Sequence, residues 1–316
     1  DRDNILKKNI SLGVIFKIVN LSIVFITIPI ILKYLGTEEF GVWVTIFSIV
    51  NVIIYIDGGI INGLKTKLAE AYSDNDMFRA KSYISSAYVL IILFSITLLL
   101  IGSLIINQIN LQELLKTNVD EQTLKNTFYI ILFTYVLGFI LNLYKPLFYA
   151  SQKSSVVELS MLIYQTIVLI FAIFFLQYFP SSIMYIAILY GLSSIVVGVF
   201  FTIIFFTKNK QSIPSLRFFN KHVVKVLFNL STGFFVIQLC MIVIFSTDNI
   251  IISNLLGPAE VTKYDVTLKL FQLFITFSVI IQDPYWALYS DAYNKRDYKW
   301  IKGVLKKWNV LFRGFI

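Results

Sequence analysis

Long apolar blocks dominate this sequence and restrict what it can fold into. Short polar segments separate the blocks, which cover residues 10–32, 42–62, 84–106, 128–149, 156–179, 183–206, 223–246 and 266–288, with a ninth opening near Val304. A helix rises 1.5 Å per residue, so about 20 residues cross the roughly 30 Å of hydrocarbon in a bilayer. The pattern predicts an all-α, polytopic bundle of transmembrane helices.

The composition agrees with a lipid environment. Hydrophobic residues make up 57% of the chain and charged residues 14%, whereas a soluble domain is roughly one quarter charged. The net charge of +9 comes from basic residues in the short segments between apolar blocks, where anionic headgroups attract them. We therefore expect membrane lipids as partners and no nucleic acid.

Two residue counts exclude most site chemistry. Cys240 is the only cysteine and His222 the only histidine of the chain. One of each leaves no intrachain disulfide and no Cys/His metal cluster. The sequence therefore predicts a protein without a metal site or cofactor, and one that is not an enzyme.

The connecting segments differ sharply in charge. If each block is one span, alternate segments lie on the same side of the membrane, and one set holds 20 Lys and Arg while the other holds 4. Short cytoplasmic loops carry the excess of basic residues in membrane proteins. This asymmetry places the amino terminus in the cytoplasm.

The chain also contains a sparse internal repeat. An ungapped offset of 221 residues pairs Leu35-Gly36 with Leu256-Gly257, Glu39 with Glu260 and Lys81 with Lys302. Six spans separate the copies, so each keeps its orientation, as in parallel-repeat transporters. We predict a first six-helix lobe over 1–206, a cytoplasmic linker over 207–222 and the start of a second lobe over 223–316. That second lobe would be incomplete, so residues beyond 316 are expected in the native gene.

Lys17 is the strongest functional candidate, because a charge near the bilayer centre costs roughly 2.5 to 3.5 kcal/mol. It lies seven residues past Ile10, which is about 10 Å into the first span at 1.5 Å per residue. The alternative is a structural lysine, either paired with a neighbour or reaching the interface along its stem.

Four further charged residues are candidates for the cavity of a transporter. Lys145 and Lys269 lie near span ends, where reaching toward the interface is an equally good explanation. Asp57 precedes Gly58-Gly59, so it can also bond backbone groups freed at a helix break. Asp248 precedes an apolar run and fits either a helix cap or a face between lobes.

Two stretches carry a family resemblance. YLGTEEFGVW at 34–43, followed by Asp57-Gly-Gly, resembles the polysaccharide flippases of the multidrug, oligosaccharidyl-lipid and polysaccharide exporter superfamily. DNIIISNLLG at 248–257, followed by Tyr264 and Pro284, is similar to the second-lobe copy of the same pattern. The resemblance covers nearly the whole chain.

This resemblance implies twelve or so spans in two six-helix lobes around a central cationic cavity that opens to one side at a time. It implies a transporter in the bacterial cytoplasmic (inner) membrane that flips oligosaccharide units on undecaprenyl diphosphate to the outer leaflet for surface polysaccharide synthesis, with a coupling ion as a further partner. Two alternatives stay open at this point. One is a cation-coupled multidrug antiporter of the same superfamily, and the other is a membrane glycosyltransferase or polymer ligase.

Overall fold

The computed structural model describes residues 2–55, 60–227, 240, 243, 247–272 and 297–313, and every regular element in these ranges is helical. This confirms the predicted all-α class. The chain forms two compact units, Asp1–Val266 and Thr267–Ile316. We call the first of them unit 1, and it holds every site discussed below.

Helix α1 (Arg2–Tyr55) contains the first two predicted spans. They meet at Gly36, which has a non-helical backbone with φ 76° and ψ 173°, so the expected loop is reduced to a single kink. Glycine suits this position because it lacks the Cβ that makes positive φ costly. The half of α1 that follows the kink is central to unit 1, since Val42, Ile46 and Val50 are at most 2% exposed.

The remaining described helices follow the predicted order with shifted boundaries. They are α2 (Ile60–Ser73), α3 (Met77–Gln108), α4 (Leu111–Leu115), α5 (Glu121–Leu141), α6 (Tyr144–Ala150), α7 (Ser154–Tyr178), α8 (Ile183–Lys208), the 3₁₀ turns η1 (Lys210–Ser212) and η2 (Leu216–Phe218), α10 (Thr247–Leu256) and, in the second unit, α12 (Tyr298–Arg313). Residues 221–227 and 258–272 are also helical. Most of the predicted spans 223–246 and 266–288 lies outside the described residues.

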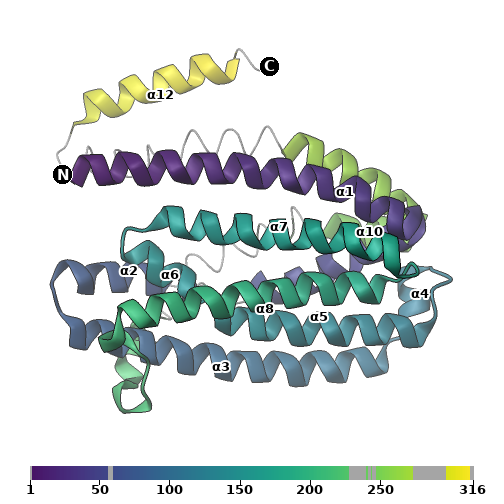
Figure 1. Ribbon diagram of the computed structural model, residues 1–316, viewed down its shortest axis with the longest axis horizontal. Helices are drawn as coiled ribbons and strands as arrows, with labels where there is room; N and C mark the ends of the chain where they lie inside the picture. Colours follow the sequence, from purple (N-terminus) through teal and green to yellow (C-terminus); the bar gives the residue numbers. More distant parts are fainter. Residues whose placement is uncertain are drawn as a thin grey trace. The chain divides into compact units, whose positions relative to one another are not determined.

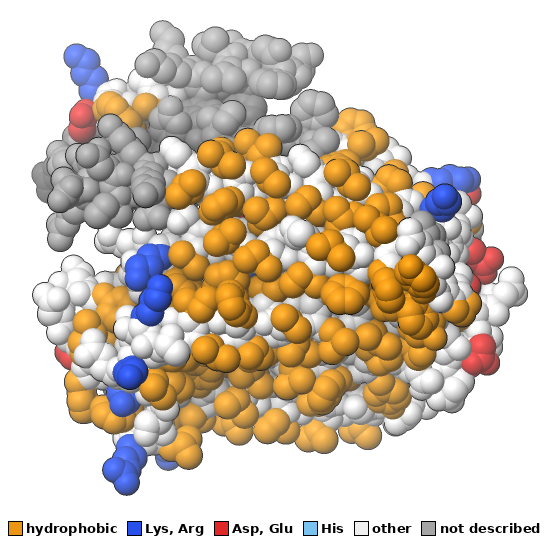
Figure 2. All heavy atoms as spheres, viewed as in Figure 1, with side chains coloured by type: hydrophobic (Ala, Val, Ile, Leu, Met, Phe, Trp, Pro, Cys, Tyr) orange, Lys and Arg blue, Asp and Glu red, His pale blue; other side chains and the backbone are white. Residues whose placement is uncertain are grey.

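Five described helices are long and apolar enough to cross a membrane: Ser11–Val50, Met77–Gln108, Glu121–Ala150, Ser154–Phe175 and Ile183–Lys208. Within unit 1, α1 packs along α7, α8 along α5, and α3 on the other side of α5 (Figure 1). The outward faces of α3, α7 and α8 expose large apolar side chains such as Leu100, Phe171 and Phe200. Hydrophobic side chains cover the middle of the visible surface (Figure 2), as lipid contact requires.

Unit 1 has two chemically different ends. The α2 and α6 helices and the segment after α8 lie at one end in Figure 1, which we call the basic end because its helices and connecting segments carry Lys65, Lys67, Lys153, Lys208 and Lys210. The opposite end, which we call the far end, holds α4, and the turn after Gly36 and helix α10 both bond to the α4 segment there. Its acidic side chains include Glu38, Glu39, Glu113, Asp120 and Glu121. The segments of the two predicted sets that belong to the described part of unit 1 therefore lie at opposite ends of its helices.

The segment expected to join the two lobes is fixed to α3 rather than extended. The backbone N–H groups of Ser215 and Asn220 donate to the hydroxyls of Ser85 and Ser86, at 3.0 and 3.1 Å. In addition, the Ser82 hydroxyl donates to the carbonyl of Phe218 at 3.0 Å. These bonds hold the η1–η2 segment against the start of α3 as far as Asn220.

Gly36 and Gly257, which the predicted repeat pairs, both have a positive φ angle. Their φ angles are 76° and 94°, and each stands between two helices. The two turns also contact each other, because the Thr262 hydroxyl donates to the Thr37 carbonyl at 2.6 Å. Nearby, the Asn249 side-chain amide donates to the Ser48 hydroxyl at 2.9 Å in a buried position. The far end thus joins the two segments that the predicted repeat pairs.

Candidate functional site

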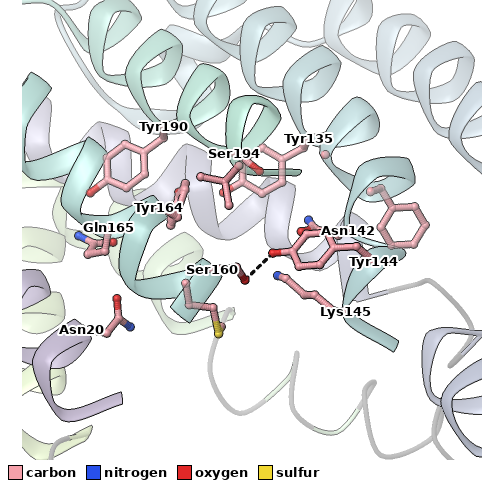
Figure 3. A pocket seen from close by; sticks show the side chains of 14 residues that line it. Asn20, Tyr135, Asn142, Tyr144, Lys145, Ser160, Tyr164, Gln165, Tyr190 and Ser194 are labelled. Atoms are coloured by element: carbon pink, nitrogen blue, oxygen red, sulfur yellow. Dashed lines mark hydrogen bonds between the residues drawn. The ribbon is translucent and has the colours of Figure 1, made fainter. Parts of the chain in front are cut away.

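Unit 1 contains a cavity of about 280 Å³ between α1, α5, α6, α7 and α8 (Figure 3). An interruption of the helix after α5 shapes one side of this cavity. Helix α5 ends at Leu141 and α6 begins at Tyr144, and between them the Leu143 N–H donates to the carbonyl of Ile140, only three residues back, at 3.3 Å. The predicted fourth span, 128–149, is therefore two helices. The break sends Tyr144 and Lys145 toward α7 instead of along the line of α5.

Polar groups face the cavity from opposite sides. Lys145, Asn142 and Tyr144 stand on one side in Figure 3, with the ammonium end of Lys145 directed toward Ser160. Tyr144 and Ser160 share a buried hydrogen bond of 2.6 Å. Since the Ser160 hydroxyl already donates to the carbonyl of Val157 at 2.6 Å, we assign the shared proton to Tyr144.

The opposite side presents two side-chain amides. Asn20 projects from α1 and Gln165 from α7 (Figure 3). The Gln165 amide donates to the Thr27 hydroxyl at 3.4 Å, which links the two helices at this level. Asn20 Oδ1 is buried without a hydrogen-bond partner among the described residues. Such an orphaned acceptor costs roughly 1–3 kcal/mol unless water or a ligand bonds it.

Aromatic rings form the wall between these two sides. Tyr135, Tyr164 and Tyr190 line the cavity, and the rings of Tyr164 and Tyr190 are 6.5 Å apart. Trp43 packs behind Tyr190 at 5.4 Å and anchors it from α1. Gly191 permits the close approach of α8 to α5, because a Cβ there would lie 2.5 Å from the Thr134 hydroxyl. The wall is therefore rigidly backed.

The charge of the described cavity lining is positive. Among the described residues that line the cavity there is one lysine and no aspartate or glutamate. Glu158 on α7 is close enough to interact electrostatically with Lys145, although it is not part of the lining. In the described part of the chain no group of acidic, histidine or cysteine side chains could hold a metal ion.

The sequence candidates fall in different places. Lys145 lines the cavity, whereas Lys17 is half-buried on α1 and outside the lining. Lys269 is half-buried on helix 258–272, in the last part of that helix, which belongs to the second unit. Asp248 accepts a hydrogen bond from the Tyr264 hydroxyl. Asp57 lies outside the described residues. The sequence analysis did not identify Asn20, Gln165 or the tyrosines. These residues are uncharged, so no energetic cost of burying a charge marks them as candidates within the apolar blocks.

The comparisons with known proteins point to one family. Residues 6–282 match the polysaccharide biosynthesis protein family. The chain belongs to that family. It is also 27% identical over 277 residues to a putative O-antigen transporter of Salmonella typhi, an alignment that covers 84% of this chain and 61% of the relative. The chain thus spans about three fifths of that curated relative.

Solved structures show the same fold. An inward-facing multidrug resistance MATE family transporter of the MOP superfamily matches with a TM-score of 0.75 at 16% identity, covering 90% of this chain and 67% of the other. A MOP superfamily transporter from Pyrococcus furiosus, described by a reversed polarity of its binding pocket, matches with a TM-score of 0.66 at 17% identity, covering 84% and 60%. The family member described here therefore has the MOP transporter fold, and with five apolar helices it is a multi-pass membrane protein.

Proposed function

We propose that this chain belongs to a transporter that moves lipid-linked oligosaccharide units, carried on undecaprenyl diphosphate, across a bacterial inner membrane by alternating access. The family match over residues 6–282 is the observation that carries the proposal. The putative O-antigen transporter of Salmonella typhi supports the choice of cargo. Both this relative and the MOP fold favour a transporter over an enzyme.

The cavity lining favours this cargo over a cationic drug. A cation leaving water needs carboxylates to balance its charge in a medium of low dielectric constant, and the described lining offers a lysine instead. A polymer ligase is also disfavoured, because such an enzyme needs acid and base groups in a sizeable external loop. Here the segment expected on the outer side of the membrane contains the short helix α4. The Glu121 carboxylate accepts hydrogen bonds from the N–H groups of Leu111 and Gln112 at the start of that helix.

Complementation tests the proposal. The intact gene is introduced into a strain that lacks its own O-unit flippase, and surface polymer and accumulated lipid-linked units are measured. We expect polymer to return and the accumulated units to fall. Unchanged accumulation at normal protein level, in hosts with several different repeat units, would contradict the proposed cargo.

Orientation is a separate prediction. The proposal puts the amino terminus and the basic end in the cytoplasm, with the first lobe over 1–206, the linker over 207–222 and the second lobe from 223. Reporter fusions at Lys67, Lys210 and Lys299 are expected to face the cytoplasm, and a fusion at Lys116 the outside. Finding Lys116 and Lys210 on the same side would show that the span order is wrong.

Lys17 gives a third prediction. It is half-buried on α1 inside an apolar span, and we propose that it faces a hydrated path between the lobes and attracts the diphosphate. Lys17→Ala is expected to reduce transport at least several-fold at normal protein level, Lys17→Arg to retain part of it, and Lys17→Glu to be worse than alanine. Quantitative complementation measures this. Wild-type transport by both Lys17→Ala and Lys17→Glu would leave Lys17 a structural role only.

A further inference from the structure

We infer that the cavity of unit 1 is a binding subsite for a single sugar ring that carries an anionic group. The inference rests on the proposed function, because it names the part of the cargo that enters this cavity. Four features of the cavity support this ligand: its size, the chemistry of its two sides, its aromatic wall and the sign of its charge.

Size limits the ligand to one ring. Sites for small molecules usually enclose roughly 300–1,000 Å³, and this cavity of about 280 Å³ lies at the lower bound. A whole oligosaccharide cannot fit, and neither can a lipid tail together with its headgroup. One ring can enter while the rest of the cargo stays outside the cavity.

The amide side suits hydroxyl groups. Asn20 and Gln165 each carry a donor and an acceptor on one side chain, which is what a sugar hydroxyl needs from its partners. Asn20 Oδ1 is buried and unbonded among the described residues, so a ligand hydroxyl donating to it would remove an existing cost. An apolar ligand would leave that oxygen unbonded.

The aromatic wall suits the faces of a sugar ring. A pyranose exposes C–H groups on its faces and hydroxyls around its edge. Tyr135, Tyr164 and Tyr190 each present an apolar ring face with a polar tip, so they can contact both kinds of surface. Because Trp43 backs Tyr190 and the Gly191 contact holds α8 on α5, little ordering is needed when a ring binds.

The Lys145 side suits an anion. An ammonium group donates three hydrogen bonds and accepts none, so its partner must be an anion or a neutral acceptor. The described lining contains no carboxylate, so it offers no charged group that would bind a metal cation instead of an anion. Two groups of the cargo have this chemistry, namely a phosphate attached to the sugar and the carboxylate of an acidic sugar.

Equilibrium dialysis of the intact gene product in detergent tests the inference with four radiolabelled probes: glucose 1-phosphate, glucuronate, methyl glucoside and inorganic phosphate. We expect saturable binding of at least one charged sugar, and binding of methyl glucoside and inorganic phosphate at least tenfold weaker. Preference for glucose 1-phosphate identifies a phosphate as the anion, and preference for glucuronate identifies a carboxylate.

Two pairs of variants assign the binding to the cavity. Lys145→Met is expected to weaken the charged sugar about tenfold, and its matched control Lys153→Met, an exposed lysine at the same end, is expected to bind as wild type. Asn20→Leu should weaken both charged and neutral sugars, whereas Ser22→Leu on the exposed face of α1 should not.

Two outcomes overturn the inference: no saturable binding of either charged sugar, or equal affinities in Lys145→Met and Lys153→Met. Two further results distinguish failure of the subsite from failure of the proposed function. If the wild-type gene restores polymer while the Lys145 and Asn20 variants do so equally well, the subsite is wrong and the function stands. If the charged sugars bind at this cavity but the wild-type gene moves no lipid-linked units, the function is wrong and the subsite stands.

Discussion

Replacing Gly41 by alanine is expected to abolish transport and to lower the yield of folded protein. A Cβ at this position would lie 1.7 Å from the carbonyl oxygen of Pro258 and 2.5 Å from its carbon. The obstacle is backbone, so a change of rotamer cannot relieve it, and helix 258–272 would have to separate from α1. Such overpacking costs at the upper end of the usual range, about 3 kcal/mol. Complementation and the melting temperature in detergent measure the two effects.

Two other glycines calibrate this result. A Cβ at Gly13 would make ordinary contact with the side chain of Glu158 at 3.7 Å, so Gly13→Ala should be neutral or slightly stabilising. Gly191→Ala should lie between the two, because it meets the side chain of Thr134 rather than backbone. Wild-type transport and melting temperature in Gly41→Ala would show that the far-end contact between the two repeats is absent from the working protein.

The spans could be predicted because they depend on local chemistry. Apolar length specifies a membrane helix, and Gly36 and Gly257 mark the kinks because only glycine adopts their φ angles without strain. The pattern did not show that the first two spans follow each other directly, with only a kink at Gly36 between them. The break at Asn142 was also missed, since an apolar stretch continues through it and Pro146 alone does not fix its position.

Of the described residues that line the cavity, only the charged one, Lys145, was among the candidates predicted from the sequence. The energetic cost of a cation inside an apolar region pointed first to Lys17, which is outside the described lining, and Lys145 was a secondary candidate near a span end. Asn20, Gln165 and Tyr190 come from three different helices, and their convergence depends on packing between α1, α7 and α8. A single sequence contains no record of that packing, so an uncharged site of this kind requires coordinates.

Reversing the charge of Lys145 is expected to have an effect as large as that of Gly41→Ala, for a different reason. Lys145→Glu would place a carboxylate near Glu158 and in front of an anionic ligand. The like charges should cost about 1 to 3 kcal/mol, less than for a fully enclosed pair because the side chain is half-buried. We expect a lower melting temperature and no transport, both measured against Lys145→Met.

The charge-swapped double variant Lys145→Glu, Glu158→Lys separates the two losses. Opposite charges again face each other in the swap, so the melting temperature should return close to that of wild type. Transport should not return, because the cavity would then present a carboxylate to the anionic group of the cargo. Lys153→Glu, an exposed reversal at the same end, is the control and should leave both quantities unchanged. Recovery of transport together with stability in the swapped variant would mean that Lys145 serves only to pair with Glu158, and that the anion is bound elsewhere.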